Sequence, residues 1–353
     1  MTSITSSALA PIFSAAGVFA ASVPILIILG LWTAALFSQT VANVVYKLHL
    51  VRLGITHLLF SSDKKWKKLG DPERVTKKRS KTVYFVRHGE SAWNVVFNKG
   101  FGKTFPKRLG NAIQKEGQLF TTLDSVFVDS PLSALGADQA IELQSYIESI
   151  PESDPAYVLK GTEPGKSVLA SSNLRRALST GTIGFWERLR RTQEKIHVLS
   201  SLQEITFNID GVALAKPYTS PVLADEEIAA LSGTSRADFD PDRYYDCSEN
   251  AGDKPVRGRG INRMLDFCKW CFKQDEQVII AAGHSLYFRF FFQTFLPYAS
   301  QHEAKKNKMA NGCVVSFTLW EGKDPNQEDR YYIDESSIRV CHQEFESKHK
   351  KHE

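Results

Sequence analysis

Residues 82–94 read TVYFVRHGESAWN, an apolar run that stops abruptly at an arginine and a histidine. The run Thr82–Val86 predicts a buried β-strand, because β-branched and aromatic residues pack well on a pleated surface. Gly89 follows the charged pair and, lacking a side chain, lets the backbone approach other groups closely. Polar side chains at the end of a buried strand are typical of ligand sites in α/β proteins, so we expect Arg87 and His88 to be functional.

Four further apolar runs resemble the first, and amphipathic stretches lie between them. The other predicted strands are Ser167–Ser171, Lys195–Leu199, Gln277–Ala282 and Cys313–Leu319. The predicted helices are Ser133–Ile150, Asn173–Arg191, Arg259–Phe272 and Ser285–Phe295. Strands that alternate with helices are typical of an α/β fold. We therefore expect a three-layer sandwich with a mostly parallel sheet and helices on both faces.

A second histidine occupies the equivalent position on another predicted strand. His284 lies between Gly283 and Ser285, directly after the strand Gln277–Ala282. The carboxyl ends of parallel strands meet at one edge of a sheet, and ligands bind there. A lone histidine in such a position is more often structural, but two of them predict a shared site.

Five short motifs occur in a fixed order along this region. They are the RHGES-x-W-N block of residues 83–94, then Ser130–Ala140, Ser172–Thr180, Leu202–Glu204 and Gly283–Ser285. This order resembles the histidine phosphatase superfamily, in its phosphoglycerate mutase-like branch. The resemblance extends over residues 82–320 and implies a phosphoglycerate mutase-like fold.

The resemblance implies roles for six residues. His88 is expected to attack phosphorus and form a phosphohistidine, and Glu204 to protonate the leaving oxygen and then activate water. His284 is expected to be catalytic as well, as a cationic donor to the phosphoryl oxygens. The expected phosphate-binding residues are Arg87, Asn94, Arg176 and His284. Fixed side chains then supply the charge stabilisation, so no metal and no cofactor is expected.

Two comparisons refine this expectation. The family spacing selects Arg176, so the neighbouring Arg175 is expected to be a solvated helix residue. The segments Val95–Lys99 and Ile205–Ile209 do not match those that follow the same motifs in the mutases. We therefore expect an enzyme that hydrolyses phosphate monoesters. A mutase-type phosphotransferase and a catalytically inactive membrane scaffold or binding module of the same fold are the alternatives.

Two long excursions leave the motif segments. The first covers residues 95–128, and the glycines and the proline between Asn94 and Glu116 predict an irregular loop that overhangs the pocket. Its basic residues are Lys99, Lys103, Lys107, Arg108 and Lys115. They favour a strongly anionic substrate, such as a phosphorylated small molecule, a phosphoinositide or a phosphoprotein. A solvated loop without a role in binding is an equal alternative. The second excursion, Asn208–Gly260, is interpreted as an insertion that caps the site.

The 353-residue chain carries a formal net charge of +5, which is distributed unevenly. Residues 1–46 contain no Asp, Glu, Lys or Arg, whereas residues 47–81, the basic collar, contain eleven Lys and Arg against three acidic residues. The remainder holds 33 basic and 36 acidic residues. Because the positive charge belongs to one short segment, no nucleic-acid partner is expected.

The uncharged run Ala15–Phe37 predicts a single membrane-spanning helix, because a helix of this length covers about 34 Å. A cleavable signal peptide and a hairpin bent at Pro24 are alternatives. All flanking Lys and Arg follow the run, which predicts a cytosolic catalytic domain and a collar that contacts anionic lipid headgroups. The ending Lys350–Glu353 resembles the dilysine retrieval signal of endoplasmic reticulum membrane proteins, with a generic charged tail as the alternative.

These observations divide the chain into four parts. They are a membrane anchor at 1–46, the basic collar or linker at 47–81, a catalytic domain at 82–342 and a charged tail at 343–353. The five cysteines are odd in number and scattered, which favours a reducing compartment over a disulfide framework. Cys268 and Cys271 form a CxxC pair in a predicted helix, and we expect two half-buried thiols rather than a redox or metal site.

Overall fold

The computed structural model of the chain describes residues 15–346, without the side chains of residues 15–22 and 25. The chain divides into two compact units, Met1–His49 and Leu50–Glu353. The first contains helix α1 (Ala15–Ala35) and the beginning of helix α2 (Gln39–Phe60). Among the described residues, no helix is both long enough and apolar enough to cross a membrane. The spanning helix expected at 15–37 is thus not found among them, and residues 1–14 of the expected anchor lie outside the described part.

The second unit is built on one seven-stranded sheet with the order β4-β3-β2-β5-β1-β6-β7. The first five strands in this order pair in parallel, whereas β6 and β7 run antiparallel to their neighbours. The strands are β1 (Thr76–Arg87), β2 (Ser167–Ser172), β3 (Ile196–Leu199), β4 (Tyr245–Asp246), β5 (Val278–Gly283), β6 (Val314–Lys323) and β7 (Asp329–His342). The expected mixed, mostly parallel α/β sheet is therefore confirmed.

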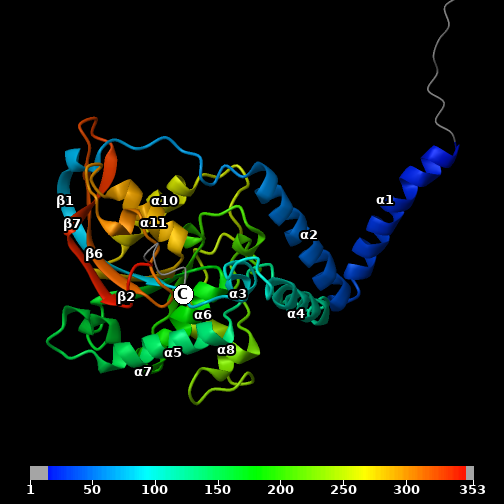
Figure 1. Cartoon of the computed structure of the whole chain (residues 1–353), viewed down its shortest axis with the longest axis horizontal. Coiled ribbons are helices and arrows are strands. Elements are labelled where there is room, and N and C mark those ends of the chain that lie inside the picture. The colour runs from blue at the N-terminus through cyan, green and yellow to red at the C-terminus, as the bar shows by residue number, and fades with distance from the viewer. Residues whose placement is uncertain (1–14, 347–353) are drawn as a thin grey trace, which may run out of the picture. The chain divides into compact units, whose positions relative to one another are not determined.

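Helices cover both faces of this sheet (Figure 1). The α-helices of the second unit after β1 are α3 (Ala92–Phe97), α4 (Phe105–Gln118), α5 (Ala134–Ser149), α6 (Arg175–Gly184), α7 (Trp186–Thr192), α8 (Asp225–Ala229), α9 (Pro241–Tyr244), α10 (Gly260–Lys273) and α11 (Ser285–Phe295). Short 3₁₀ helices are η1 (Pro72–Arg74), η2 (Pro155–Lys160), η3 (Ser200–Leu202), η4 (Ile209–Gly211) and η5 (Glu303–Lys305). The predicted helix Asn173–Arg191 is divided into α6 and α7 at Phe185.

Alternating residues of β1 divide the core into two halves, because successive side chains of a strand point to opposite faces. Val83 and Phe85 pack in one cluster with α10 and α11, and Tyr84 and Val86 pack in the other with α5, α6 and α7. The Phe85 ring stacks on Phe288 of α11 with centroids 4.0 Å apart. This packing fixes α11, and with it the residue that precedes the helix, His284.

The cysteine pair lies inside the first of these halves. Cys268 and Cys271 are fully buried on α10, although the sequence predicted half-buried thiols. Burial raises the pKa of both thiols well above the ordinary value, so they stay protonated and unreactive.

Candidate active site

The register of β1 and β5 brings the two histidine motifs together. Arg87 lies opposite Gly283 in this parallel pair, and the amide of His88 donates to the carbonyl of Gly283 at 3.0 Å. Each histidine therefore follows its strand at the same level of the sheet. The ring centroids of His88 and His284 are 5.1 Å apart. Gly283 is needed here, because a Cβ at this position would lie 2.8 Å from the Phe288 ring.

A cavity of about 100 Å³ opens at this edge of the sheet. Five of the six predicted site residues line it, namely Arg87, His88, Asn94, Arg176 and Glu204. The sixth, His284, is fully buried beside His88. The structure therefore brings together residues that lie up to 197 positions apart in the sequence.

The hydrogen bonds of His88 leave one ring nitrogen available for chemistry. Its Nδ1 lies 2.6 Å from the carbonyl oxygen of Gly89, and because a carbonyl only accepts, Nδ1 carries the proton. Nε2 therefore holds a lone pair, which accepts from Nε of Arg176 at 3.3 Å. Burial and the charges of Arg176 and Arg87 hold the pKa of His88 well below the ordinary value. The ring is thus neutral and nucleophilic at neutral pH.

Two arginines from different elements line the small cavity together with His88. Arg176 stands in the first turn of α6, where its Nη1 donates to the carbonyl of Asp210 at 2.8 Å. Arg87, at the end of β1, donates from Nη1 to the carbonyl of Met309 and lies 2.5 Å from a carboxylate oxygen of Glu346. Its Nε is buried and has no hydrogen-bond partner among the described residues. An unpartnered guanidinium nitrogen beside the cavity is suited to a phosphate oxygen.

His284 is neutral in the free site, whereas the sequence predicted a cation in the complex. Its Nε2 lies 2.8 Å from Oγ of Ser172, and its Nδ1 is buried without a partner among the described residues. Burial, followed by the charges of Arg176 and the neighbouring His88, lowers its pKa well below the ordinary value. The expected positive charge therefore requires the negative charge of a bound phosphate.

Glu204 and Asn94 each commit one oxygen to the backbone. Oε1 of Glu204 accepts from the amides of Ile205 at 3.0 Å and Tyr287 at 2.8 Å, which leaves Oε2 for a proton. Oδ1 of Asn94 accepts from the amide of Ser91 in a capping box that begins α3. The side-chain nitrogen of Asn94, Nδ2, is the group that remains to donate to a ligand.

Two charged residues of the cavity carry no motif in the sequence. Asp210 follows Glu204 by six positions; burial raises its pKa, and its Oδ2 lies 3.6 Å from Nη2 of Arg176. Lys308 precedes Met309, which pairs with Phe345. Neither residue lies next to a predicted strand end, so only tertiary structure reveals them.

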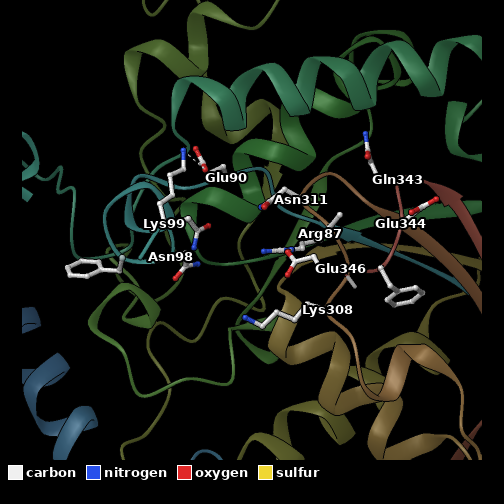
Figure 2. Close-up of a pocket in the computed structure, with 13 residues that line it drawn as sticks. Arg87, Glu90, Asn98, Lys99, Lys308, Asn311, Gln343, Glu344 and Glu346 are labelled. Atoms are coloured by element: carbon white, nitrogen blue, oxygen red, sulfur yellow. Dashed lines mark hydrogen bonds and ion pairs between the residues drawn. The ribbon is translucent and has the colours of Figure 1, made fainter. Parts of the chain in front are cut away.

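A larger cavity of about 1020 Å³ adjoins the small one (Figure 2). The two cavities share Arg87, Asn94, Asn98 and Lys308. Figure 2 shows the carboxylate of Glu346 beside Arg87, with the Lys308 side chain near them. The C-terminal end of the described chain therefore supplies an anion to an arginine that is expected to bind phosphate.

Arg175 corrects another expectation, because it is fully buried rather than solvated. Its Nε donates to the carbonyl of Asp129 at 2.8 Å, and its Nη1 pairs with Asp124. Its backbone amide donates to Oδ1 of Asp129 at 2.8 Å. The two adjacent arginines thus separate in role: Arg176 enters the cavity, and Arg175 holds the 124–129 segment.

The first excursion, residues 95–128, is also more ordered than expected. It forms the end of α3 and all of α4, instead of an irregular loop. Lys99 lines the larger cavity and pairs with Glu90 at 3.0 Å. Lys115 pairs with Glu226, and Arg108 donates to backbone carbonyls of the excursion itself. Of the five basic residues named for this excursion, Lys99 is the one that lines either of the two cavities.

The second excursion contributes Asn208 and Asp210 to the small cavity, while its later part adds β4 to the edge of the sheet. Within residues 15–346, no group of three or more His, Cys, Asp or Glu side chains is arranged to hold a metal ion.

The sequence matches no protein-family model and no curated protein. Among solved structures, it is similar to a mycobacterial hydrolase (16% identity, 72% of this chain and 97% of that chain, TM-score 0.35). It is also similar to the mycobacterial glucosyl-3-phosphoglycerate phosphatase in complex with VO3 (13%, 72% and 97%, TM-score 0.34). A third is a mutant phosphoserine phosphatase from Entamoeba histolytica in complex with phosphoserine (13%, 74% and 96%, TM-score 0.35).

At identities of 13–16%, these likenesses concern the fold alone. Two of these three structures are phosphatases by name.

Proposed function

We propose that this chain hydrolyses phosphate monoesters through a phosphohistidine at His88. The observation that carries the proposal is the lone pair on His88 Nε2, which faces Arg176 while Nδ1 is held by the Gly89 carbonyl. Glu204 and Arg87 line the same small cavity. A neutral nucleophile, two permanent cations and a carboxyl group are the components that metal-independent phosphoryl transfer through histidine requires.

In the first step, Nε2 of His88 forms a bond to phosphorus, and the bond between phosphorus and the ester oxygen breaks. The ester oxygen leaves with the bonding electrons and takes a proton from Oε2 of Glu204. The imidazole becomes positively charged, and the Gly89 carbonyl on Nδ1 stabilises that charge. Arg87 and Arg176 donate to the phosphoryl oxygens, which carry the negative charge in the transition state.

In the second step, a water oxygen attacks phosphorus and gives a proton to Glu204. The nitrogen–phosphorus bond breaks, and its electrons return to Nε2 of His88. The sum of both steps is ester plus water to alcohol plus inorganic phosphate, with the histidine and the glutamate restored. The proposed substrates are phosphorylated small molecules, phosphoinositides or phosphoproteins, of which the cavity dimensions best suit a small molecule.

The test is turnover of 4-nitrophenyl phosphate by the full chain and by the variant His88→Ala. We expect hydrolysis by the unsubstituted chain, an acid-labile phosphoenzyme on rapid quenching, and neither from the variant. His197→Ala is the matched control, because His197 is half-buried and lies outside both cavities. Absence of turnover by the unsubstituted chain, or full activity of His88→Ala, contradicts the proposal and leaves an inactive binding module of the same fold.

We further propose that residues 1–46 and the basic collar attach the chain to a membrane, with the catalytic unit in the cytosol. The support is the uncharged sequence and the exposure of Leu26, Leu29 and Trp32 on α1. Cell fractionation tests it: the full chain should sediment with membranes after a carbonate wash, and a chain without residues 1–46 should not. Recovery of both in the supernatant contradicts it. Replacing Lys350 and Lys351 then tests retrieval to the endoplasmic reticulum.

A further inference from the structure

One buried carboxylate attaches the chain segment between α2 and β1 to the rest of the second unit. Asp63 is only 3% exposed, although it belongs to the basic collar, which the sequence described as a linker. Its own backbone carbonyl accepts from the amide of Gly260 at 2.9 Å. The amide of the preceding Ser62 donates to the carbonyl of Val256 at 3.1 Å. The segment is therefore fixed on both sides of the Asp63 side chain.

Both oxygens of the Asp63 carboxylate are fully used. Oδ1 accepts from Nη1 of Arg263 at 2.7 Å. Oδ2 accepts from Nζ of Lys254 at 2.9 Å, from the amide of Thr206 at 3.0 Å and from Nη2 of Arg263 at 3.2 Å. Burial alone would raise the pKa of Asp63, but Lys254 and Arg263 outweigh it and hold the pKa below the ordinary value. The group is thus a carboxylate between two cations.

The same two cations hold the backbone that carries Glu204. Nζ of Lys254 donates to the carbonyls of Glu204 at 2.6 Å and Thr206 at 2.7 Å, in addition to Asp63. An ammonium group has three protons, so this lysine has no donor left. Nη2 of Arg263 lies 3.4 Å from the Glu204 carbonyl as well. The backbone from Glu204 to Thr206 is therefore fixed by a cluster that Asp63 completes.

We propose that Asp63 is a positioning residue for Glu204, acting through Lys254, Arg263 and the amide of Thr206. The inference rests on the proposed function, because it assigns Glu204 the proton transfer. Without the carboxylate, two buried cations face each other and must separate. The 203–206 segment then shifts, and Oε2 of Glu204 leaves the position from which it reaches the ester oxygen.

The experiment compares two substrates in the full chain, because they differ in their need for a proton donor. An alkyl phosphate releases an alkoxide that must be protonated, whereas 4-nitrophenyl phosphate releases a stabilised phenolate. The value of kcat/KM reports the steps up to phosphorylation of His88. For Asp63→Asn we expect kcat/KM to fall about 100-fold with the alkyl phosphate, the size of effect that a 1 Å misplacement causes. With the aryl phosphate it should change less than about threefold, since little of the general-acid contribution is at stake.

Asp71→Asn is the matched control. Asp71 belongs to the same segment and caps η1 through the amide of Glu73, without contact to the Glu204 loop. Both substrates should keep their kcat/KM in this variant. Because Asp63→Asn leaves unpaired cations that can unfold the protein, the double variant D63N/K254M removes one charge of each sign. It should show the same selective loss with the alkyl phosphate, at a temperature below its measured unfolding midpoint.

Equal losses with both substrates in a folded variant, or no loss with either, would overturn the proposal. The cluster would then serve stability alone. Failure of the proposed function gives a different result, because the unsubstituted chain would turn over neither substrate.

Discussion

Replacing Glu346 with glutamine measures how strongly the side-chain carboxylate of this residue competes with phosphate for Arg87. The carboxylate oxygen lies 2.5 Å from Nη1 of Arg87, and the guanidinium is almost entirely buried. Glutamine keeps the shape and a carbonyl oxygen that accepts, but it removes the charge. If phosphate must displace this carboxylate, then E346Q should bind phosphate more tightly than the unsubstituted chain.

The exposure of the pair sets the size of the effect. The Glu346 side chain is 38% exposed, so water screens the ion pair and reduces it to about 1 kcal/mol. That free energy corresponds to about a fivefold change in an equilibrium constant. We therefore expect the inhibition constant of inorganic phosphate to fall about fivefold in E346Q. The difference should decrease in high salt, which screens exposed charges.

The assay is competitive inhibition of 4-nitrophenyl phosphate hydrolysis by inorganic phosphate. Glu344→Gln is the control, because Glu344 lines the same cavity but is exposed. Its backbone carbonyl accepts from the amide of Ala310 at 2.8 Å, and the substitution leaves that hydrogen bond in place. It should leave the inhibition constant nearly unchanged. An unchanged or weakened affinity for phosphate in E346Q refutes the reasoning and indicates that Glu346 orients Arg87 instead of occupying it.

Three further outcomes are expected. First, burial and Arg176 hold the pKa of His88 and His284 well below 6.5, so both rings stay neutral at and above that pH. A pH series of kcat/KM should therefore show a decline through histidine protonation only at more acidic pH. An acid limb centred at or above pH 6.5 contradicts this. Second, Arg175→Ala removes the positive partner of Asp124 and Asp129 and should lower the free energy of unfolding, measured by urea titration, by about 3–5 kcal/mol. Arg190 is exposed, so Arg190→Ala should leave this free energy nearly unchanged. Third, Lys308→Met removes a cation from the cavity whose interaction with a phosphate ester contributes about 1 kcal/mol to binding. KM for phosphate esters should rise about fivefold, with kcat little changed. An equal fall in kcat contradicts a binding role for Lys308.

The strands that build the site were predictable because they are buried on both faces. Short, continuous apolar runs such as Val278–Gly283 are typical of strands buried in a parallel sheet, and each of these strands ends at a motif. The edge strand β7 was missed because its sequence lacks regular alternation: the polar run Asp334–Ser337 interrupts its apolar residues. Helix α4 was missed for a different reason: Pro106 was interpreted as a loop residue, although proline is well tolerated in the first turn of a helix.

The residues that meet at the candidate site lie at positions that the sequence marks, but several of their partners do not. His88 and His284 stand at strand ends, and a strand end can be recognised locally. Asp63 and Lys254 are 191 positions apart, and each sits in a segment that looks like an ordinary charged surface. Single-residue patterns do not reveal such pairs, because their burial depends on the packing of separate segments.

The buried carboxylate of Asp63 also sets the limit of the smallest piece of this chain that keeps a complete site. A fragment that begins at residue 82 contains every motif, yet it lacks the counterion of Lys254 and Arg263 and half of β1. A fragment that begins at residue 50 retains the motifs, this counterion and the whole of β1. A recombinant fragment for work on the second unit should therefore begin within α2, 32 residues upstream of where the motifs alone suggest.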